Sequence, residues 1–441
     1  MKRHLSNAAY GVLDYAAYPI AMLVSAPTLL KHLGVAEYGI WIVTTAALNT
    51  GSIIASGFGD ANIQYISSAR NYGDSDLLLR AVRSMLGINL LLGILLAILS
   101  WILAPFAVSH VVGSSAALQS SCLVSLRLAS ALMLVRAVES VCVSTQRAFE
   151  RYGAAVRISL FARVITVAAA VLLSMRGFGV AAIMVATAGL MVLSTATQLI
   201  RLRQYLGATY LVPSFDRQAT SVLFGFGAFS WLLAVSSVLF TQADRLLLGV
   251  SLGATTVTAY ALCVQMAQPI YGIASSGLHF LFPYLSARRA VSDPEALRKT
   301  VLSAFAVNLL IVATGTAILL LFGPAALYAW VGPSVAKSAV GILAPIVYSF
   351  ALLGLSVTGY YSLLALGQIR IVTVLNLSGG LVMFPLMVWL LHLQGVHGIA
   401  TARLSYGLVA LLMYVPLARA LGGARALFPS PAEACAVGEE L

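Results

Sequence analysis

Long apolar stretches recur along this sequence with short polar connections between them, and no other feature constrains the fold as strongly. A helix needs about 20 apolar residues to cross the hydrocarbon core of a bilayer, and twelve stretches reach that length. Only 9% of the 441 residues are charged, whereas a soluble domain carries about 25%. A soluble enzyme is therefore excluded, and the sequence predicts an all-α polytopic membrane protein with twelve transmembrane helices. The predicted helices cover residues 10–30, 38–59, 84–108, 118–145, 154–175, 179–200, 225–249, 256–283, 299–322, 338–365, 370–392 and 397–419.

The basic residues between these stretches predict which side of the membrane each connection faces. Cytoplasmic connections carry an excess of Lys and Arg. With a cytoplasmic N-terminus, eighteen basic residues fall on inside connections and three on outside connections. We therefore expect a multi-pass protein with both termini in the cytoplasm. The net charge of +12 does not indicate a nucleic-acid partner, because the basic residues are spread along the chain and form no single patch.

An internal repeat divides the chain into two halves. A shift of 219 residues aligns 32–70 with 251–289 without a gap, and Gly34 and Gly253 are one of eight identical pairs. A shift of six spans preserves orientation, so we predict two six-helix bundles related by a pseudo-two-fold axis along the membrane normal, with substrate between them. The predicted domains are an N-terminal bundle (1–205), a C-terminal bundle (206–421) and a disordered cytoplasmic tail (422–441).

The sequence contains no convincing pattern for a catalytic site, a metal site or a cofactor. The four cysteines form no C-x-x-C pair and the six histidines are scattered. Residues 249–253 fit G-x-S-x-G, but spanning helices flank them where a nucleophile elbow needs a strand and a helix. We therefore expect a protein that is not an enzyme. A membrane-embedded polysaccharide-assembly enzyme is the weakest alternative, because such enzymes usually carry a long polar loop.

Two stretches at equivalent places of the repeat carry a resemblance to a known family. Residues 33–69 contain a short turn LG-x-x-x-YG-x-W and then a helix that ends in a G-x-G-D turn. Residues 243–262 contain D-x-x-L-L-G-x-x-x-G and then a helix with Tyr260. This pattern resembles the Wzx-like polysaccharide flippases, which form the polysaccharide transport family of the MOP (multidrug/oligosaccharidyl-lipid/polysaccharide) exporter superfamily. Thr258 stands where that family often has a glycine.

The resemblance implies a fold and a function. It implies two bundles in a V around a cationic central cavity, and alternating-access translocation of undecaprenyl-pyrophosphate-linked oligosaccharide from the inner to the outer face of the bacterial inner membrane. The oligosaccharide would be a repeat unit of lipopolysaccharide O-antigen, capsule or exopolysaccharide. The expected partners are this lipid-linked oligosaccharide on its polyprenyl pyrophosphate carrier, membrane lipids, a coupling ion (proton or sodium) and polysaccharide polymerase components, with no cofactor.

Two other kinds of transporter have a similar number of helices. An ion-coupled exporter of drugs or small solutes from the same superfamily is the main alternative. The major facilitator fold also has twelve helices in two bundles. It usually carries G-x-x-x-D-R/K-x-G-R/K between its second and third helices, and residues 57–76 do not contain this motif.

Ionisable residues inside the predicted helices are the candidate site residues, because each costs about 2.5–3.5 kcal/mol on insertion scales. Five are arginines and three are carboxylates, and the two cations in excess suit an anionic ligand. We predict that Arg136 and Arg163 hold the pyrophosphate, because each lies roughly 13 Å above the inner end of its helix and guanidinium groups match phosphate oxygens. Glu139, one turn from Arg136, would partly offset their charge.

The other candidates are assigned by charge and position. The repeat aligns Asp244 and Arg245 with residues inside the first helix, which predicts that both lie in the outer part of the seventh. The further substrate-binding candidates in the cavity are Arg127, Arg245 and Arg403, the candidate charge partners or coupling groups are Glu139, Asp14 and Asp244, and the candidate gate or kink residues are Pro19 and Pro27.

Overall fold

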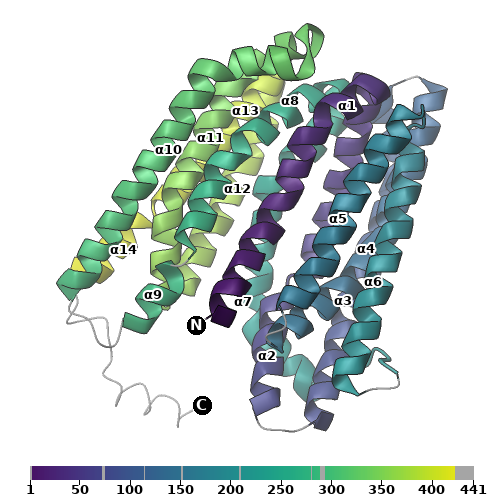
Figure 1. Ribbon diagram of the computed structural model, residues 1–441. Coiled ribbons are helices and arrows are strands. Elements are labelled where there is room, and N and C mark those ends of the chain that lie inside the picture. Colours follow the sequence, from purple (N-terminus) through teal and green to yellow (C-terminus); the bar gives the residue numbers. More distant parts are fainter. Residues whose placement is uncertain are drawn as a thin grey trace.

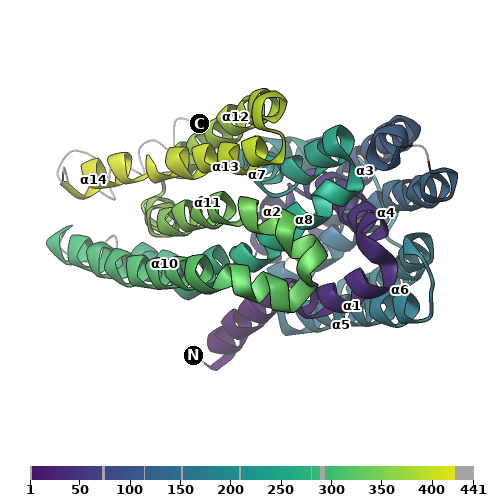
Figure 2. The same cartoon turned by 90° about the horizontal axis from the view of Figure 1, so that it is seen from above.

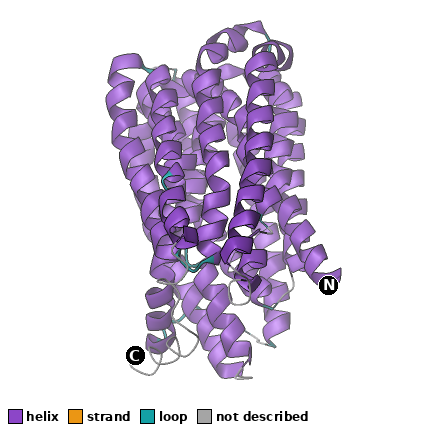
Figure 3. Ribbon diagram, turned by 90° about the vertical axis from the view of Figure 1, so that its left-hand side faces the viewer, coloured by secondary structure: helices purple, strands orange, loops and turns teal. Residues whose placement is uncertain are grey.

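The chain is all-helical, without strands, in the residues that the computed structural model describes (Figure 3), as the apolar stretches predict. The described residues are 2–71, 75–113, 115–149, 152–207, 210–279, 281–288 and 294–422. The helices are α1 (Lys2–Ala55), α2 (Gly59–Asn71), α3 (Ser75–Val112), α4 (Ala116–Ala148), α5 (Tyr152–Met175), α6 (Val180–Leu206), α7 (Arg217–Thr241), α8 (Ala243–Leu278), α9 (Leu281–Arg288), α10 (Pro294–Val331), α11 (Pro333–Ala365), α12 (Ile369–Gln394), α13 (Val396–Leu411) and α14 (Tyr414–Gly422).

Within these residues the helices make twelve passages between the two ends of the molecule. Two passages are joined in α1 at Gly34, and α7 forms one passage together with the start of α8 up to Gly253. Ten helices in the described part are long and apolar enough to cross a membrane. The double passage of α1 and the divided passage at α7 account for the other two. The short helices α2 and α9 lie at the end where α1 begins and α14 ends (Figure 1).

The passages are arranged in two lobes, in agreement with the predicted fold class. Figure 1 shows α3 to α6 on one side and α9 to α13 on the other, and Figure 2, along the passages, shows α1 and α8 between them. In one lobe α3 and α6 pack against α4; in the other, α10 and α13 pack against α11. The proposed domain boundary between residues 205 and 206 stays a prediction. Residues 423–441 of the predicted tail lie outside the described residues.

The internal repeat is visible in the backbone itself. Gly34 has φ 77° and ψ 170°, and Gly253, its equivalent in the second half, has φ 79° and ψ 171°. Helices α3 (75–112) and α10 (294–331) also coincide under the 219-residue shift. This backbone conformation is open essentially to glycine alone, which explains why both halves have glycine at the turn between their first two passages.

The two turns bring α1 and α8 into contact through repeat-related residues. Gly39 lies against the backbone carbonyl of Ala254. Thr258, the equivalent of Gly39, donates a hydrogen bond of 2.8 Å from its hydroxyl to the carbonyl of Val35, the equivalent of Ala254. We call these four residues the turn-end contact. It joins the two lobes at the end of the molecule opposite the start of α1.

The Gly39→Ala variant tests whether α1 and α8 approach closely at the turn-end contact. A Cβ at Gly39 would overlap the carbonyl group of Ala254, so we expect α1 and α8 to separate. The expected cost in free energy of unfolding is about 1–3 kcal/mol, as for other overpacked sites, seen as a lower unfolding temperature of the purified protein. Gly189→Ala in α6 is the matched control, because an added Cβ there meets nothing within 4 Å. Equal unfolding temperatures of the two variants would contradict the contact.

Candidate functional site

A cavity of about 460 Å³ lies between the two lobes. The second passage of α1 lines it with Ile42, Thr45, Asn49 and Ile53, whose spacing of three or four residues places them on one face of the helix. The remaining described wall comes from the first passage of α1 and from α7, α8, α11, α12 and α13. The volume falls within the range of about 300–1,000 Å³ typical of small-molecule sites.

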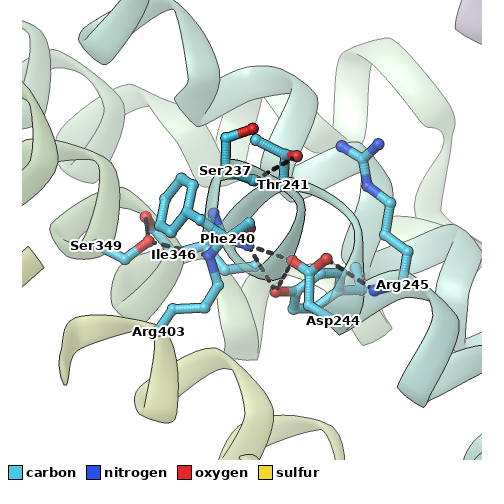
Figure 4. Close-up of polar contacts among 9 residues, drawn as sticks. Ser237, Phe240, Thr241, Asp244, Arg245, Ile346, Ser349 and Arg403 are labelled. Atoms are coloured by element: carbon cyan, nitrogen blue, oxygen red, sulfur yellow. Dashed lines mark hydrogen bonds and ion pairs between the residues drawn. The ribbon is translucent and has the colours of Figure 1, made fainter. Parts of the chain in front are cut away.

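Arg245 is the cation of this lining that has no carboxylate partner among the described residues. Its backbone N–H donates to Oδ1 of Asp244 at 2.7 Å, but its Nε is buried and makes no hydrogen bond there. In Figure 4 the guanidinium points away from the other charged groups. Arg245 lies eight residues before the Gly253 turn, or about 12 Å along the helix, in the part of the passage that the repeat predicts.

Arg403, the second arginine of the lining, is neutralised by a buried ion pair with Asp244 (Figure 4). The side chains of Arg403 and Asp244 are only 1% and 0% exposed. Tyr260 donates its hydroxyl hydrogen to the same carboxylate at 2.7 Å. The guanidinium carbon also lies 4.2 Å from the ring centroid of Phe240 and 5.0 Å from that of Phe350. This pair joins α8 to α13 and adds no net charge to the cavity.

The interruption between α7 and α8 gives the two neighbouring charges different surroundings. Gln242 separates the helices, with φ −129° and ψ −29°, and its carbonyl accepts the N–H of Leu246. Successive residues of a helix point about 100° apart. Asp244 therefore faces the interior of its lobe, where it meets Arg403, while Arg245 lines the cavity.

Arg136 and Arg163 do not line this cavity. Arg136 forms an ion pair with Glu139 at 2.9 Å, with side chains 30% and 9% exposed, which is the pairing that their one-turn spacing predicts. Arg163 is half-buried on α5. The structure therefore does not bring these two arginines together with Arg245, and their predicted role in pyrophosphate binding stays a prediction.

Arg127 and Pro27 also lie away from the lining. The guanidinium of Arg127 sits 5.0 Å from the ring centroid of Trp101, whose side chain is exposed on α3, and Arg127 is not part of the cavity wall. Helix α1 continues through Pro27, and its backbone leaves the helical region at Gly34. The side chains of Asp14 and Pro19 lie outside the described residues.

The sequence prediction missed the neutral polar and aromatic residues of the wall. Asn49 and Gln268 are equivalent under the 219-residue shift, and both line the cavity. Thr45 and Val264 form a second such pair. A search for polar residues at repeat-related positions inside the spans, rather than for ionisable residues alone, would have found the first pair.

The described lining offers groups that can bind a polar ligand. Among its described residues it presents guanidinium, amide, hydroxyl and aromatic groups and no Asp, Glu, His, Cys or Lys. The described part of the chain also contains no group of three or more His, Cys, Asp or Glu residues that could hold a metal ion. Such a wall can hold an anion and a neutral polar ligand together.

Comparison with known proteins gives a family and a fold. The family model described as "Polysaccharide biosynthesis protein" matches residues 29–332. No curated protein sequence matches the chain.

Three solved structures of similar fold share little sequence with the chain. The inward-facing conformation of a multidrug resistance MATE family transporter of the MOP superfamily superposes with a TM-score of 0.70 and 15% identity, over 94% of this chain and 95% of that one. The lipid II flippase MurJ in an inward closed conformation gives 0.71 and 13%, over 91% and 87%. An outward-facing MATE transporter gives 0.56 and 16%, over 93% and 96%. At such identities they show the MOP-type fold.

Proposed function

Because the chain belongs to the polysaccharide biosynthesis protein family, we propose that it is a flippase for oligosaccharides linked to a polyprenyl diphosphate, the precursors of a bacterial surface polysaccharide. The observation that carries the proposal is the cavity between the lobes, with an arginine that no described carboxylate neutralises and no acidic residue among its described lining. The similarity in fold to a lipid II flippase supports the same substrate class. Within this proposal the cavity holds the substrate during transport.

The physical reason for an arginine in the cavity is the charge of the substrate. A diphosphate moved through hydrocarbon without a partner would lose its hydration, at a cost far above that of any neutral sugar contact. A guanidinium offers paired donors that match phosphate oxygens, and it stays charged at all working pH values. We therefore assign the diphosphate to Arg245 during translocation. Arg403 supports this site by fixing Asp244, so that this carboxylate does not neutralise Arg245.

An ion-coupled exporter of drugs or small solutes is the second candidate, and the similarity in fold to a multidrug resistance MATE transporter supports it. A cationic drug or solute is held best by a carboxylate, which neutralises its charge. The described lining contains no carboxylate, and its charged residues are arginines. The electrostatics of the cavity therefore favour an anionic substrate.

Within this proposal, the Lys and Arg residues of the connections between spans predict the orientation of the protein in the membrane. They place the start of α1 and the end of α14 at the cytoplasmic face of the inner membrane, so the turn-end contact lies at the outer face. Proton or sodium coupling through Glu139 or Asp14, and cooperation with polymerase components, stay predictions.

Reconstitution tests the proposal directly. Purified protein in liposomes that contain a lipid-linked oligosaccharide in both leaflets should make the inner-leaflet fraction accessible to an added membrane-impermeant glycosidase. Protein-free liposomes, the control, should protect that fraction. Full protection in the presence of folded protein, together with accumulation of a cationic dye in the same vesicles, would replace the flippase by the drug exporter.

A further inference from the structure

A group of tyrosines from the C-terminal lobe lines the cavity, farther from the Gly253 turn than Arg245. Tyr271 lies on α8, and Tyr360 and Tyr361 lie on α11. The rings of Tyr360 and Tyr361 meet edge to face, with centroids 5.3 Å apart. The hydroxyl of Tyr361 is 3.1 Å from that of Ser275, which fixes the ring against α8. We call Tyr271, Tyr360 and Tyr361 the tyrosine wall.

The tyrosine wall differs from the other tyrosines of the described core in its accessibility. Tyr38 and Tyr260 are fully buried and Tyr406 is 4% exposed, and Tyr260 is held in the Asp244 ion pair. The three rings of the wall are only part-buried. Aromatic rings fixed in place yet open to a cavity offer apolar faces at little further cost in side-chain entropy.

The surroundings of the tyrosine wall include neutral polar groups and one imidazole, the ring of His279, whose centroid lies 5.6 Å from that of Tyr361. Gln268 lies one helical turn from Tyr271, and Asn49 on α1 lines the same cavity. An aromatic face combined with amide and hydroxyl groups is the combination that sugars require: the C–H face of a pyranose stacks on the ring, and its hydroxyls exchange hydrogen bonds with the amides. A phosphate or a lipid chain would use only one of these two sets of groups.

The distance between Arg245 and the tyrosine wall adds a second argument. Tyr271 lies 26 residues beyond Arg245 in the sequence, with the Gly253 turn between them. Counted from that turn, Arg245 is about 12 Å down its passage and Tyr271 about 27 Å down the next. Arg245 and Tyr271 are therefore about 15 Å apart along the passages, a distance longer than one sugar ring. The cavity thus separates an anion site from an aromatic site.

We infer that the tyrosine wall is a subsite for neutral sugar residues of the oligosaccharide, held beyond the sugar that carries the diphosphate. This inference rests on the proposed flippase function and assigns a different part of the substrate to a different part of the cavity. Arg245 binds the carrier diphosphate that all such substrates share. The tyrosine wall binds the glycan and so contributes the preference for a loaded carrier over an empty one.

The test compares two ligands in the purified full-length protein: undecaprenyl diphosphate without sugar, and the lipid-linked saccharide fraction extracted from a strain of the source bacterium that lacks the protein. We expect wild-type protein to bind the sugar-bearing lipid at least tenfold more tightly. The Tyr360→Leu/Tyr361→Leu variant should lose this preference and keep its affinity for the bare lipid. The Tyr360→Phe/Tyr361→Phe variant, the matched control, should keep most of the preference because its rings remain.

Two results would overturn the sugar subsite: a leucine variant that keeps the preference, or one that binds both lipids equally less well. Failure of the anion assignment gives a different result. In that case Arg245→Ala would bind both lipids as wild type does, while the preference for the sugar-bearing lipid would still depend on Tyr360 and Tyr361.

Discussion

Arg245→Ala is expected to reduce translocation of lipid-linked oligosaccharide by tenfold or more, without loss of folded protein. Hydrogen bonds to charged groups contribute about 1.5–3 kcal/mol each, and about 1.4 kcal/mol corresponds to a factor of ten. Because the described lining offers Arg403 only in a neutral pair with Asp244, no second free cation there replaces Arg245. The glycosidase-accessibility assay in liposomes measures the rate, and thermal unfolding measures the fold.

The Arg245→Lys variant distinguishes the effect of the positive charge from the effect of the guanidinium geometry. Arg245→Lys should keep part of the rate, because the charge remains while the paired donors of the guanidinium are lost. Arg136→Ala is the matched control, since it also removes one arginine from a passage but from outside the cavity lining. A normal rate in Arg245→Ala together with a strongly reduced rate in Arg136→Ala would return the anion site to Arg136 and Arg163.

Breaking the Arg403–Asp244 pair from one side should destabilise the protein strongly. Removal of one partner leaves a buried charge without compensation, which costs about 3–5 kcal/mol in comparable buried pairs. We therefore expect Asp244→Asn and Arg403→Met each to lower the unfolding temperature of the purified protein markedly. The double variant contains neither charge, and we expect it to regain more than half of the lost free energy of unfolding.

The exposed pair of Lys299 and Glu295 provides the control for this prediction. Its atoms are 3.0 Å apart, but its side chains are 76% and 69% exposed, and such pairs contribute about 0–1 kcal/mol. Lys299→Met should therefore leave the unfolding temperature almost unchanged. Strictly additive losses in the Asp244→Asn/Arg403→Met double variant would show that the two buried charges do not stabilise one another, and would contradict the pairing.

The fold follows from local properties of the sequence, and this explains why it could be predicted. Apolar stretches of sufficient length must form helices in a bilayer, since the backbone has no other way to satisfy its hydrogen bonds there. The repeat also has a local cause, because Gly34 and Gly253 occupy turns whose positive φ excludes other residues. Each spanning stretch and each glycine turn is specified by residues that are close together in the sequence.

The site was harder to predict because it depends on how the helices are rotated against one another. The position of Arg136 along its helix follows from the rise per residue, but the sequence does not reveal whether that face meets the cavity. The partner of Arg403 is 159 residues away in the sequence, and no local pattern connects the two. Arg245 is a candidate because it is ionisable and the repeat predicts that it lies inside a span, whereas Asn49 and Gln268 were missed because they carry no charge.

The position of the bound diphosphate tests the central assignment most directly. An experimental structure of the full-length protein with undecaprenyl diphosphate, determined by cryo-electron microscopy, would show it. We predict phosphate oxygens within hydrogen-bond distance of the Arg245 guanidinium, in the cavity between the lobes, with the Arg403–Asp244 pair intact. A diphosphate bound instead between Arg136 and Arg163, with Arg245 free of it, would contradict the assignment.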